Sequence, residues 1–369
     1  MNGDRVLTLA GQDVPVVGTA RMYVCGITPY DTTHLGHASM FVWADVAARV
    51  LQTTGVDVAI SRNITDVDDE LLARAEAENV GWRSLAVQQT YRFERDMADL
   101  NVAKPTYEPK SFDYVADVLA LAQILMGRGV AYEREGNVYF RAASTAERAG
   151  LSRDEALALA AERGGYPDDP LKDDPLDAVV WQRASEDEPG WPSPWGRGRP
   201  GWHAECTVMA LATLGPGIDV HVGGADLAFP HHAVEAAQGE AALDVHPFAR
   251  SWLRVGTVRV GGEKMAKSAG NLVMVQEVLD SSSPDAVRLM ILDRPWSEPW
   301  EYSKEALADA SARLEGLWRA AGRRDGDDAA TDAAVDALLD DLDVPRALRI
   351  AEEAGGRTTR AVAGLLGLT

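Results

Sequence analysis

The 369-residue sequence predicts an α/β protein built on a doubly wound parallel sheet. Near its start, an apolar strand at Met22 is followed by a helical run ending at Leu51 and by a second strand over Val56–Ile60. A strand, a helix and a strand in this order form a βαβ unit. Later, a helix opening at Trp202 leads into a strand over Ile218–Val222, in the second half of the core. A chain of this length fits two or three lobes around one core.

Composition excludes several classes of protein. The apolar share of 46% is ordinary for a globular protein, and no apolar run approaches the length of a membrane span. The N-terminus has no basic-then-apolar signal segment, so we expect a cytoplasmic protein with no membrane partner. The two cysteines, Cys25 and Cys206, lie far apart in the sequence, which argues against a secreted disulfide scaffold.

The formal net charge of −21 bears on nucleic-acid binding. Proteins that bind nucleic acids usually carry a basic face, because the neutralisation of phosphates dominates their affinity. An acidic chain can still hold a local basic groove, so the charge counts only against a large tRNA-wrapping surface. An acidic proteome is the alternative explanation of the charge.

The segment Met22–His37 joins the first strand to the first helix. Its Gly- and Pro-broken turn leads into the letters HLGH at 34–37 and then into a helical run over Ala38–Leu51. This layout presents backbone N–H groups to phosphates, although no G-x-G-x-x-G fingerprint is present. The two imidazoles that flank Gly36 can hydrogen-bond a triphosphate. Cys25 stands at the strand end, where ligand sites of α/β proteins form.

The acidic loop Asn63–Asp69 follows the second strand. It has two interpretations: an acidic turn that caps a helix, or a loop at a substrate site beyond the carboxyl end of a parallel strand. The remaining expected elements are helices over Glu70–Leu100, Val115–Leu125 and Glu155–Ala161, a hairpin over Ala131–Ala142, a non-periodic segment over Gly164–Asp177, a surface loop over Ala184–Pro200, a strand over Val255–Val260 and a helical region from Pro284 broken at Arg323–Asp328.

Six of the seven histidines and both cysteines fall in a few separated segments. Clusters of Cys and His in segments that can converge mark a metal or catalytic site, whereas a single Cys is more often a small buried hydrophobic residue. His231 and Glu235 are four apart in a helical segment and therefore share one face. With Cys25 and Cys206 they make a plausible four-ligand set for tetrahedral zinc.

Two motifs resemble the signatures of class I aminoacyl-tRNA synthetases. HLGH at 34–37 resembles the HIGH signature, and KMAKS at 264–268 resembles KMSKS, with Ala266 in place of the usual Ser. The surrounding segments are most similar to the cysteine branch of that class, which holds cysteinyl-tRNA synthetases and the mycothiol cysteine ligases. The segments that favour the ligases are CGITPYDTTHLGHA, NITDVDD, AERGGYPDDP, GRGRPGWHAEC and DDLDVPRAL. The resemblance runs from about Met22 to the end of the chain.

The resemblance implies a class I synthetase Rossmann-like catalytic domain with an inserted connective domain and a C-terminal helical bundle. The implied boundaries are 1–120 for the first half of the catalytic domain, 121–198 for the insertion, 199–262 for the second half with the metal ligands, 263–300 for the KMAKS loop and connecting fold, and 301–369 for the bundle. It also implies a monomer.

The resemblance further implies an ATP-dependent, AMP-forming cysteine ligase that uses ATP with Mg. The catalytic set that it implies is Thr28, His34, His37, Lys264 and Lys267. The residues expected around substrate and adenylate are Cys25, Gly26, Ile27, Thr28, Met40, Asn63, Ile64, Thr65, Trp202, Gly224, Ala225, Asp226 and Val258.

Four of these residues carry specific expectations. Asp226 is the candidate partner of the cysteine ammonium. Trp202 either packs against the small substrate side chain or belongs to the core. Met40 and Ala225 depart from the ligase pattern, which more often has Thr and Ser at these positions, and this bears on the identity of the acceptor.

One zinc ion per chain follows from the same resemblance, with Cys25, Cys206, His231 and Glu235 as its ligands. Its expected role is selectivity, because a hydrophobic pocket separates cysteine from serine poorly, while zinc prefers a soft thiolate. The ligases rely on two Cys and one His, so Glu235 is a ligand, a weak outer ligand or a surface carboxylate of its helix.

The acceptor of the activated cysteine separates the functional hypotheses. About 100 residues follow Lys267, enough for a connecting fold and a modest bundle. Residues 301–369 carry 14 acidic and nine basic side chains, a net charge of −5, whereas an anticodon platform should be basic. Both observations favour a small amine over tRNA, and the resemblance implies that this amine is the one of glucosaminyl-inositol. The alternatives are a cysteinyl-tRNA synthetase-like ligase, a cysteine ligase with another amine acceptor, and a paralogue that binds without turnover.

Overall fold

The computed structural model describes residues 5–30, 33–266 and 269–369. Its centre is a sheet of four strands in the order β10-β9-β3-β4, and all three neighbouring pairs run parallel. The strands are β3 (Thr19–Ile27), β4 (Asp57–Ile64), β9 (Ile218–Gly224) and β10 (Ala249–Val255). Strands β3 and β9 lie side by side although they are far apart in the sequence. The prediction of an α/β fold with a parallel sheet is confirmed.

Helix α1 (Leu35–Gln52) connects β3 to β4 and is buried along most of its length. It begins at Leu35 and not at Ala38, because the His34 side chain caps it by accepting hydrogen bonds from the backbone N–H groups of Gly36 and His37. The helix therefore starts inside the HLGH motif.

The insertion between the two halves of the sheet forms a second lobe. Its antiparallel sheet has the order β5-β6-β7-β8, and the predicted hairpin is its first pair. The elements between β4 and β9 are α2 (Asp69–Ala77), α3 (Trp82–Asp99), η1 (Ser111–Tyr114), α4 (Val115–Gly127), β5 (Ala131–Arg134), β6 (Asn137–Phe140), α5 (Ser144–Arg148), α6 (Arg153–Glu162), β7 (Ala178–Arg183), β8 (Gly198–Pro200) and α7 (Trp202–Leu214).

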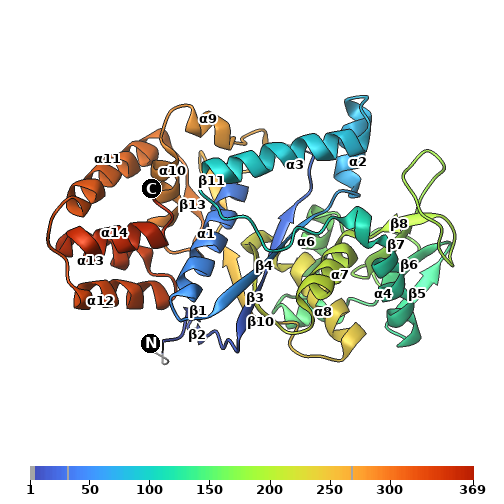
Figure 1. Cartoon of the computed structure of the whole chain (residues 1–369). Helices are drawn as coiled ribbons and strands as arrows, with labels where there is room; N and C mark the ends of the chain where they lie inside the picture. The colour runs from blue at the N-terminus through green and yellow to red at the C-terminus, as the bar shows by residue number, and fades with distance from the viewer. Residues whose placement is uncertain (1–4, 31–32, 267–268) are drawn as a thin grey trace.

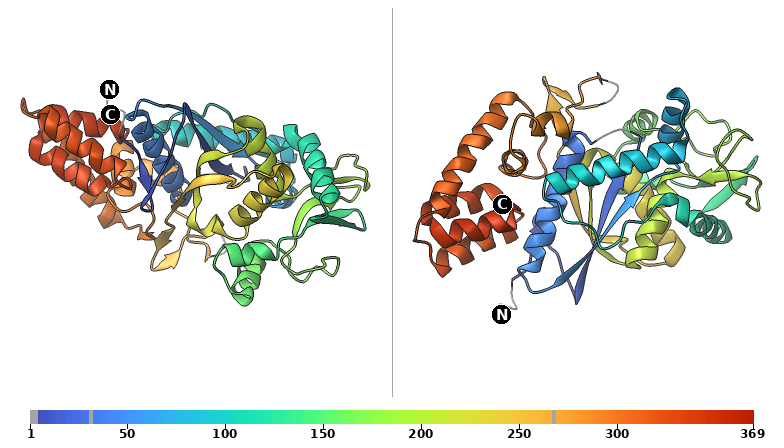
Figure 2. Two further views of the ribbon diagram at one scale, coloured as in Figure 1. Left: turned by 90° about the horizontal axis from the view of Figure 1, so that it is seen from below. Right: turned by 45° about the horizontal axis from the view of Figure 1, so that its top comes forward.

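The C-terminal helices pack on the opposite side of the central sheet from this insertion, as Figures 1 and 2 show. One hydrophobic core joins α1 and the central strands to these helices, so the bundle is part of the main body. The remaining elements are β1 (Thr8–Leu9), β2 (Gln12–Asp13), η2 (Ala225–Ala228), α8 (His231–Leu243), β11 (Val258–Val260), β12 (Glu263–Lys264), α9 (Val275–Leu279), α10 (Pro284–Leu292), β13 (Trp300–Glu301), α11 (Lys304–Ala321), α12 (Asp328–Leu339), α13 (Val344–Ala354) and α14 (Gly356–Leu365).

Three predicted elements are wrong in detail. The strand expected over Val255–Val260 is two strands, because β10 ends at Val255 and β11 begins at Val258. Between them, a Cβ on Gly256 would lie 2.1 Å from the carbonyl oxygen of Glu298, so the chain must turn there without a side chain. The expected surface loop over 184–200 ends in the buried strand β8, and the helical region expected from residue 284 is interrupted by β13.

The helices were compared with the requirements of a membrane span. None of the helices in the described part of the chain has the length and apolar character that a membrane span requires.

Candidate active site

Helix α1 starts at the sheet edge where the candidate site is built. His34 and His37 stack there, with ring centroids 3.9 Å apart and planes 22° from parallel. Burial lowers the pKa of His37 to about 4, so this imidazole is neutral at pH 7 and acts as a hydrogen-bonding group without charge. A Cβ on Gly36 would lie 2.9 Å from the His34 ring, which explains the glycine between the two histidines.

The ends of β3 and β4 bring four predicted residues together. The Gly26 N–H donates to the side-chain oxygen of Asn63 over 2.8 Å, and the hydroxyls of Thr28 and Thr65 lie 2.7 Å apart. The Asn63 amide also reaches the Cys206 sulfur at 3.5 Å. The end of the acidic loop Asn63–Asp69 caps a helix, because the Asp68 side chain accepts the Glu70 N–H at the start of α2.

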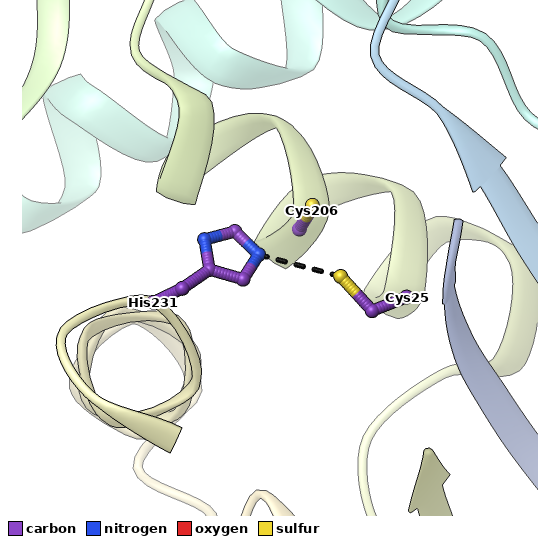
Figure 3. A group of neighbouring side chains, drawn as sticks. All are labelled: Cys25, Cys206 and His231. Carbon is purple, nitrogen blue, oxygen red and sulfur yellow. Dashed lines mark hydrogen bonds between the residues drawn. The ribbon is translucent and has the colours of Figure 1, made fainter. Parts of the chain in front are cut away.

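Cys25, Cys206 and His231 converge from β3, α7 and α8, as Figure 3 shows. The Cys25 sulfur lies 3.5 Å from Nε2 of His231, and one ligand atom from each of the three residues falls within 4.8 Å of the others. All three side chains are buried. Two sulfurs and an imidazole nitrogen at this spacing are a donor set that suits a soft divalent metal.

Two side chains hold the His231 ring in place. Nδ1 of His231 lies 2.8 Å from Nδ1 of His203, and the Trp202 ring stacks on His231 with centroids 3.9 Å apart and planes 17° from parallel. Burial lowers the pKa of His203 to about 3 and that of His231 well below its ordinary value, so both rings are neutral. If Nε2 of His231 binds a metal, its Nδ1–H donates to His203.

Sequence reasoning gave His203 no specific role. Its position three residues before Cys206 was the available signal, since that spacing on a helix brings both side chains to one face.

The fourth predicted metal ligand lies in a different group. The Glu235 carboxylate accepts a hydrogen bond from Nε2 of His221 at 3.0 Å, and these two residues with His232 form a second buried set of metal-binding atoms. Glu235 is not among the three side chains that converge at Cys25. Of the four predicted zinc ligands, Cys25, Cys206 and His231 lie together, and Glu235 belongs to the other group.

The first lysine of the KMAKS motif reaches another predicted residue. Nζ of Lys264, on β12, lies 2.7 Å from a carboxylate oxygen of Asp226, which is on η2. A Cβ on Gly224 would lie 2.4 Å from the Asp226 carboxylate, so this glycine leaves room for the acid. Ala225 opens η2 beside them, whereas Lys267 lies outside the described residues.

Four of the residues expected around the substrate lie in the main hydrophobic core. They are Ile27, Met40, Ile64 and Val258, each at most 6% exposed. Trp202 is half-buried and contacts His231, which fits a wall of the site better than a core position.

A family model described as the catalytic domain of class I (C) tRNA synthetases matches residues 13–312. The chain belongs to this family. Members of the class I (C) family with 44% identity to it include proteins named L-cysteine:1D-myo-inositol 2-amino-2-deoxy-alpha-D-glucopyranoside ligase from Acidothermus cellulolyticus and Mycolicibacterium smegmatis. The first alignment covers 90% of this chain and 84% of the relative, and the second covers 89% and 82%.

Solved structures support the same fold. Methionyl-tRNA synthetase of Mycobacterium tuberculosis, in complex with methionyl-adenylate, aligns with a TM-score of 0.68 at 17% identity, over 95% of this chain and 82% of that one. At this identity the likeness concerns the fold alone. The sequence relatives and the family model show that the protein is an ATP-dependent ligase.

Proposed function

We propose that the protein activates L-cysteine with ATP, forming cysteinyl-AMP, and transfers the cysteinyl group to the amine of glucosaminyl-inositol in mycothiol biosynthesis. The observation that carries the proposal is the group of two thiols and one imidazole beside the HLGH helix. A relative that is 44% identical to this chain is named as a ligase of L-cysteine and an amino-sugar inositol, and the proposal takes its two substrates from that relative.

Zinc is the metal that this group fits best. Cys25, Cys206 and His231 are buried, their ligand atoms lie close together, and the imidazole is neutral. Bound there, zinc supplies a soft Lewis acid that prefers the cysteine thiolate to the hydroxyl of serine. Glu235 stands one hydrogen bond from His221, so its role as a fourth ligand is open to a direct test by Glu235→Gln.

The chain's own residues position the two ends of cysteine. The Thr65 hydroxyl donates to Thr28 or to the Ile27 carbonyl oxygen, which leaves the Thr28 hydroxyl to donate to the substrate carboxylate. Asp226 offers a carboxylate to the ammonium group. His34 and His37 stand at the start of α1, where they bind ATP phosphates, His37 as a neutral group, and Lys264 adds a positive charge.

The reaction has two steps. A carboxylate oxygen of cysteine attacks the α-phosphorus of ATP, and pyrophosphate leaves. The acceptor ammonium first loses one proton to solvent, and the neutral amine then attacks the carbonyl carbon. The C–N bond forms, the C–O bond to AMP breaks, and the nitrogen releases a second proton to solvent. The protein's contribution is mainly placement and charge stabilisation.

The first test is cysteine-dependent ATP–pyrophosphate exchange by the purified protein, with serine as the control and zinc measured on the same sample. Exchange with cysteine alone, at about one zinc per chain, is the expected result. Amide formation with glucosaminyl-inositol and no charging of tRNA would then complete the assignment. A folded, zinc-loaded protein without exchange would contradict the proposed function.

A further inference from the structure

A pocket lies between the catalytic half-sheet and the insertion. Asp68, Asp69, Trp202 and Glu205 line it from the catalytic side, and Gly165 and Tyr166 line it from the insertion. Trp202 stacks on His231, so one wall of this pocket is also the cover of the thiol–imidazole group. We call it the acidic pocket.

Glu205 is the feature of the acidic pocket that demands an explanation. This side chain is 1% exposed, and neither of its carboxylate oxygens has a partner at ordinary hydrogen-bond distance among the described residues. Burial raises the Glu205 pKa and the nearby Ser111 hydroxyl acts to lower it, but this hydroxyl donates to the carbonyl oxygen of Ile64. Buried polar groups in native proteins are almost always paired, because an unpaired carboxylate is costly to remove from water. A donor that is absent from the protein itself would satisfy it.

The charges around the acidic pocket select the kind of donor. Asp68 uses one carboxylate oxygen to cap α2, accepting the N–H of Glu70 at 2.9 Å. Asp69 pairs with Arg199, whose guanidinium also binds Glu188 at 3.2 Å. Four carboxylates line the pocket, those of Asp68, Asp69, Asp177 and Glu205, against one guanidinium that is shared with Glu188. A cation that enters the pocket therefore finds carboxylate partners, and its charge favours their ionised form.

The acidic pocket continues into a neighbouring pocket on the insertion. A second pocket shares Tyr166, Val179 and Gln182 with the acidic pocket and is lined further out by Asn137 and Tyr139. Polar side chains and aromatic rings on such walls suit a hydroxylated ring, whose hydroxyls form hydrogen bonds and whose C–H groups pack on aromatic faces. The two pockets together offer room for a ligand with two rings.

We infer that the acidic pocket binds the acceptor, a primary ammonium carried on a polyhydroxylated ring, with Glu205 and Asp68 facing the nitrogen. The inference rests on the proposed function and deepens it, because it says where the second substrate binds. The ammonium enters next to Trp202, beside the position of the activated cysteine, and a second ring extends past Tyr166. Three N–H donors on one nitrogen match the two carboxylate oxygens of Glu205 and the Asp68 oxygen that does not cap α2.

The test separates the acceptor from the activation chemistry. The zinc-loaded full chain is titrated with glucosaminyl-inositol by calorimetry, and Asp68→Asn and Glu205→Gln are compared with wild type. Asparagine still caps a helix, so Asp68→Asn keeps α2 intact. Each variant is expected to weaken binding about 10- to 100-fold, the value of a charge-assisted hydrogen bond. Glu70→Gln, on the exposed side of the same turn, is the matched control and should bind as wild type does.

Two further measurements distinguish a failure of this inference from a failure of the proposed function. The analogue with a hydroxyl in place of the amine should bind the wild type weakly and show no further loss in Asp68→Asn, since its charge is already missing. Unchanged amine affinity in both variants, with zinc content as in wild type, would overturn the inference. A wild-type protein that binds the amine but lacks cysteine-dependent ATP–pyrophosphate exchange would instead contradict the proposed function, while amine binding at the acidic pocket would still be supported.

Discussion

Gly26 shows how closely single residues are fitted at the end of β3. A Cβ at this position would lie 1.7 Å from the carbonyl oxygen of Asn63, on the neighbouring strand. Backbone cannot move aside as a side chain can, so the hydrogen bond between Gly26 and Asn63 requires glycine.

Gly26→Ala should destabilise the protein by more than ~2 kcal/mol, because β3 and β4 must separate to admit the methyl group. Gly127→Ala is the control, since a Cβ there meets nothing within 4 Å on helix α4, and it should stabilise by ~0.5–1 kcal/mol. Urea unfolding of the two variants measures both. Equal effects would show that the strand ends can adjust.

His203 should matter for metal affinity through its contact with His231. His203→Ala leaves the ligands in place but frees the His231 ring, so zinc affinity should fall ~10–100-fold. Competition with a chromogenic chelator measures the affinity. His246→Ala, an exposed histidine paired with Glu240, is the matched control and should leave it unchanged; a comparable loss in both variants would exclude a specific role for His203.

Asp68 should make stability depend on pH. Burial, followed by the negative charges of Glu70 and Asp69, raises the pKa of this half-buried carboxyl to about 7, while the Glu70 N–H and Arg199 lower it. The native protein therefore holds the proton more tightly than the unfolded chain, and this contribution to stability is lost as pH rises from about 4 to about 7. Asp68→Asn should gain Tm relative to wild type more at pH 8 than at pH 5. The same gain at both pH values would refute the raised pKa.

At the scale of elements, α1 connects the site to the C-terminal helices. Asp45, in the middle of α1, binds Arg288 of α10 at 2.7 Å, and the Arg288 guanidinium also donates to the carbonyl oxygens of Leu100 and Leu366. Both charged side chains are almost fully buried. The bundle thus holds the helix whose first turn carries the HLGH motif.

Asp45→Ala should cost ~3–5 kcal/mol in unfolding free energy, because it leaves the Arg288 charge buried without its partner. Adding Arg288→Met should recover part of that loss by removing the orphaned charge. Glu315→Ala, which breaks an exposed pair with Arg319 on α11, should change stability by at most ~0.5 kcal/mol. A double variant less stable than Asp45→Ala would contradict this explanation.

Elements with a clear apolar period could be predicted, and polar ones could not. The strand β10 escaped detection because few of its residues are large and apolar: Ser251 lies on its buried face, and Arg250 and Arg254 are exposed on the other. Strand β8 escaped because it is three residues long and holds a buried arginine. Such strands are stabilised by pairing with distant segments, which local sequence patterns do not record.

For the whole molecule, the parallel sheet and the meeting of Cys25, Cys206 and His231 could be anticipated. Cys25 lies on β3, and the helices that carry Cys206 and His231 lead into and out of β9, which pairs with β3. The separate grouping of Glu235 with His221 could not, because it depends on which of two buried partners a side chain reaches after packing. The acidic pocket could not be anticipated from the sequence either, because its walls come from two lobes that are distant in sequence.

The ion pair between Lys264 and Asp226 has a thermodynamic consequence. If the ammonium of cysteine displaces the lysine from Asp226, the lysine is released for the phosphates of ATP. Each substrate then lowers the dissociation constant of the other by the same factor, about fivefold or more. A non-hydrolysable ATP analogue should bind tighter with cysteine than without it, whereas 3-mercaptopropionate, which keeps the thiol and carboxylate but lacks the ammonium, should give no such gain. The binding of cysteine and of ATP would thus be coupled through the Asp226 carboxylate, which exchanges the lysine ammonium for the ammonium of the substrate.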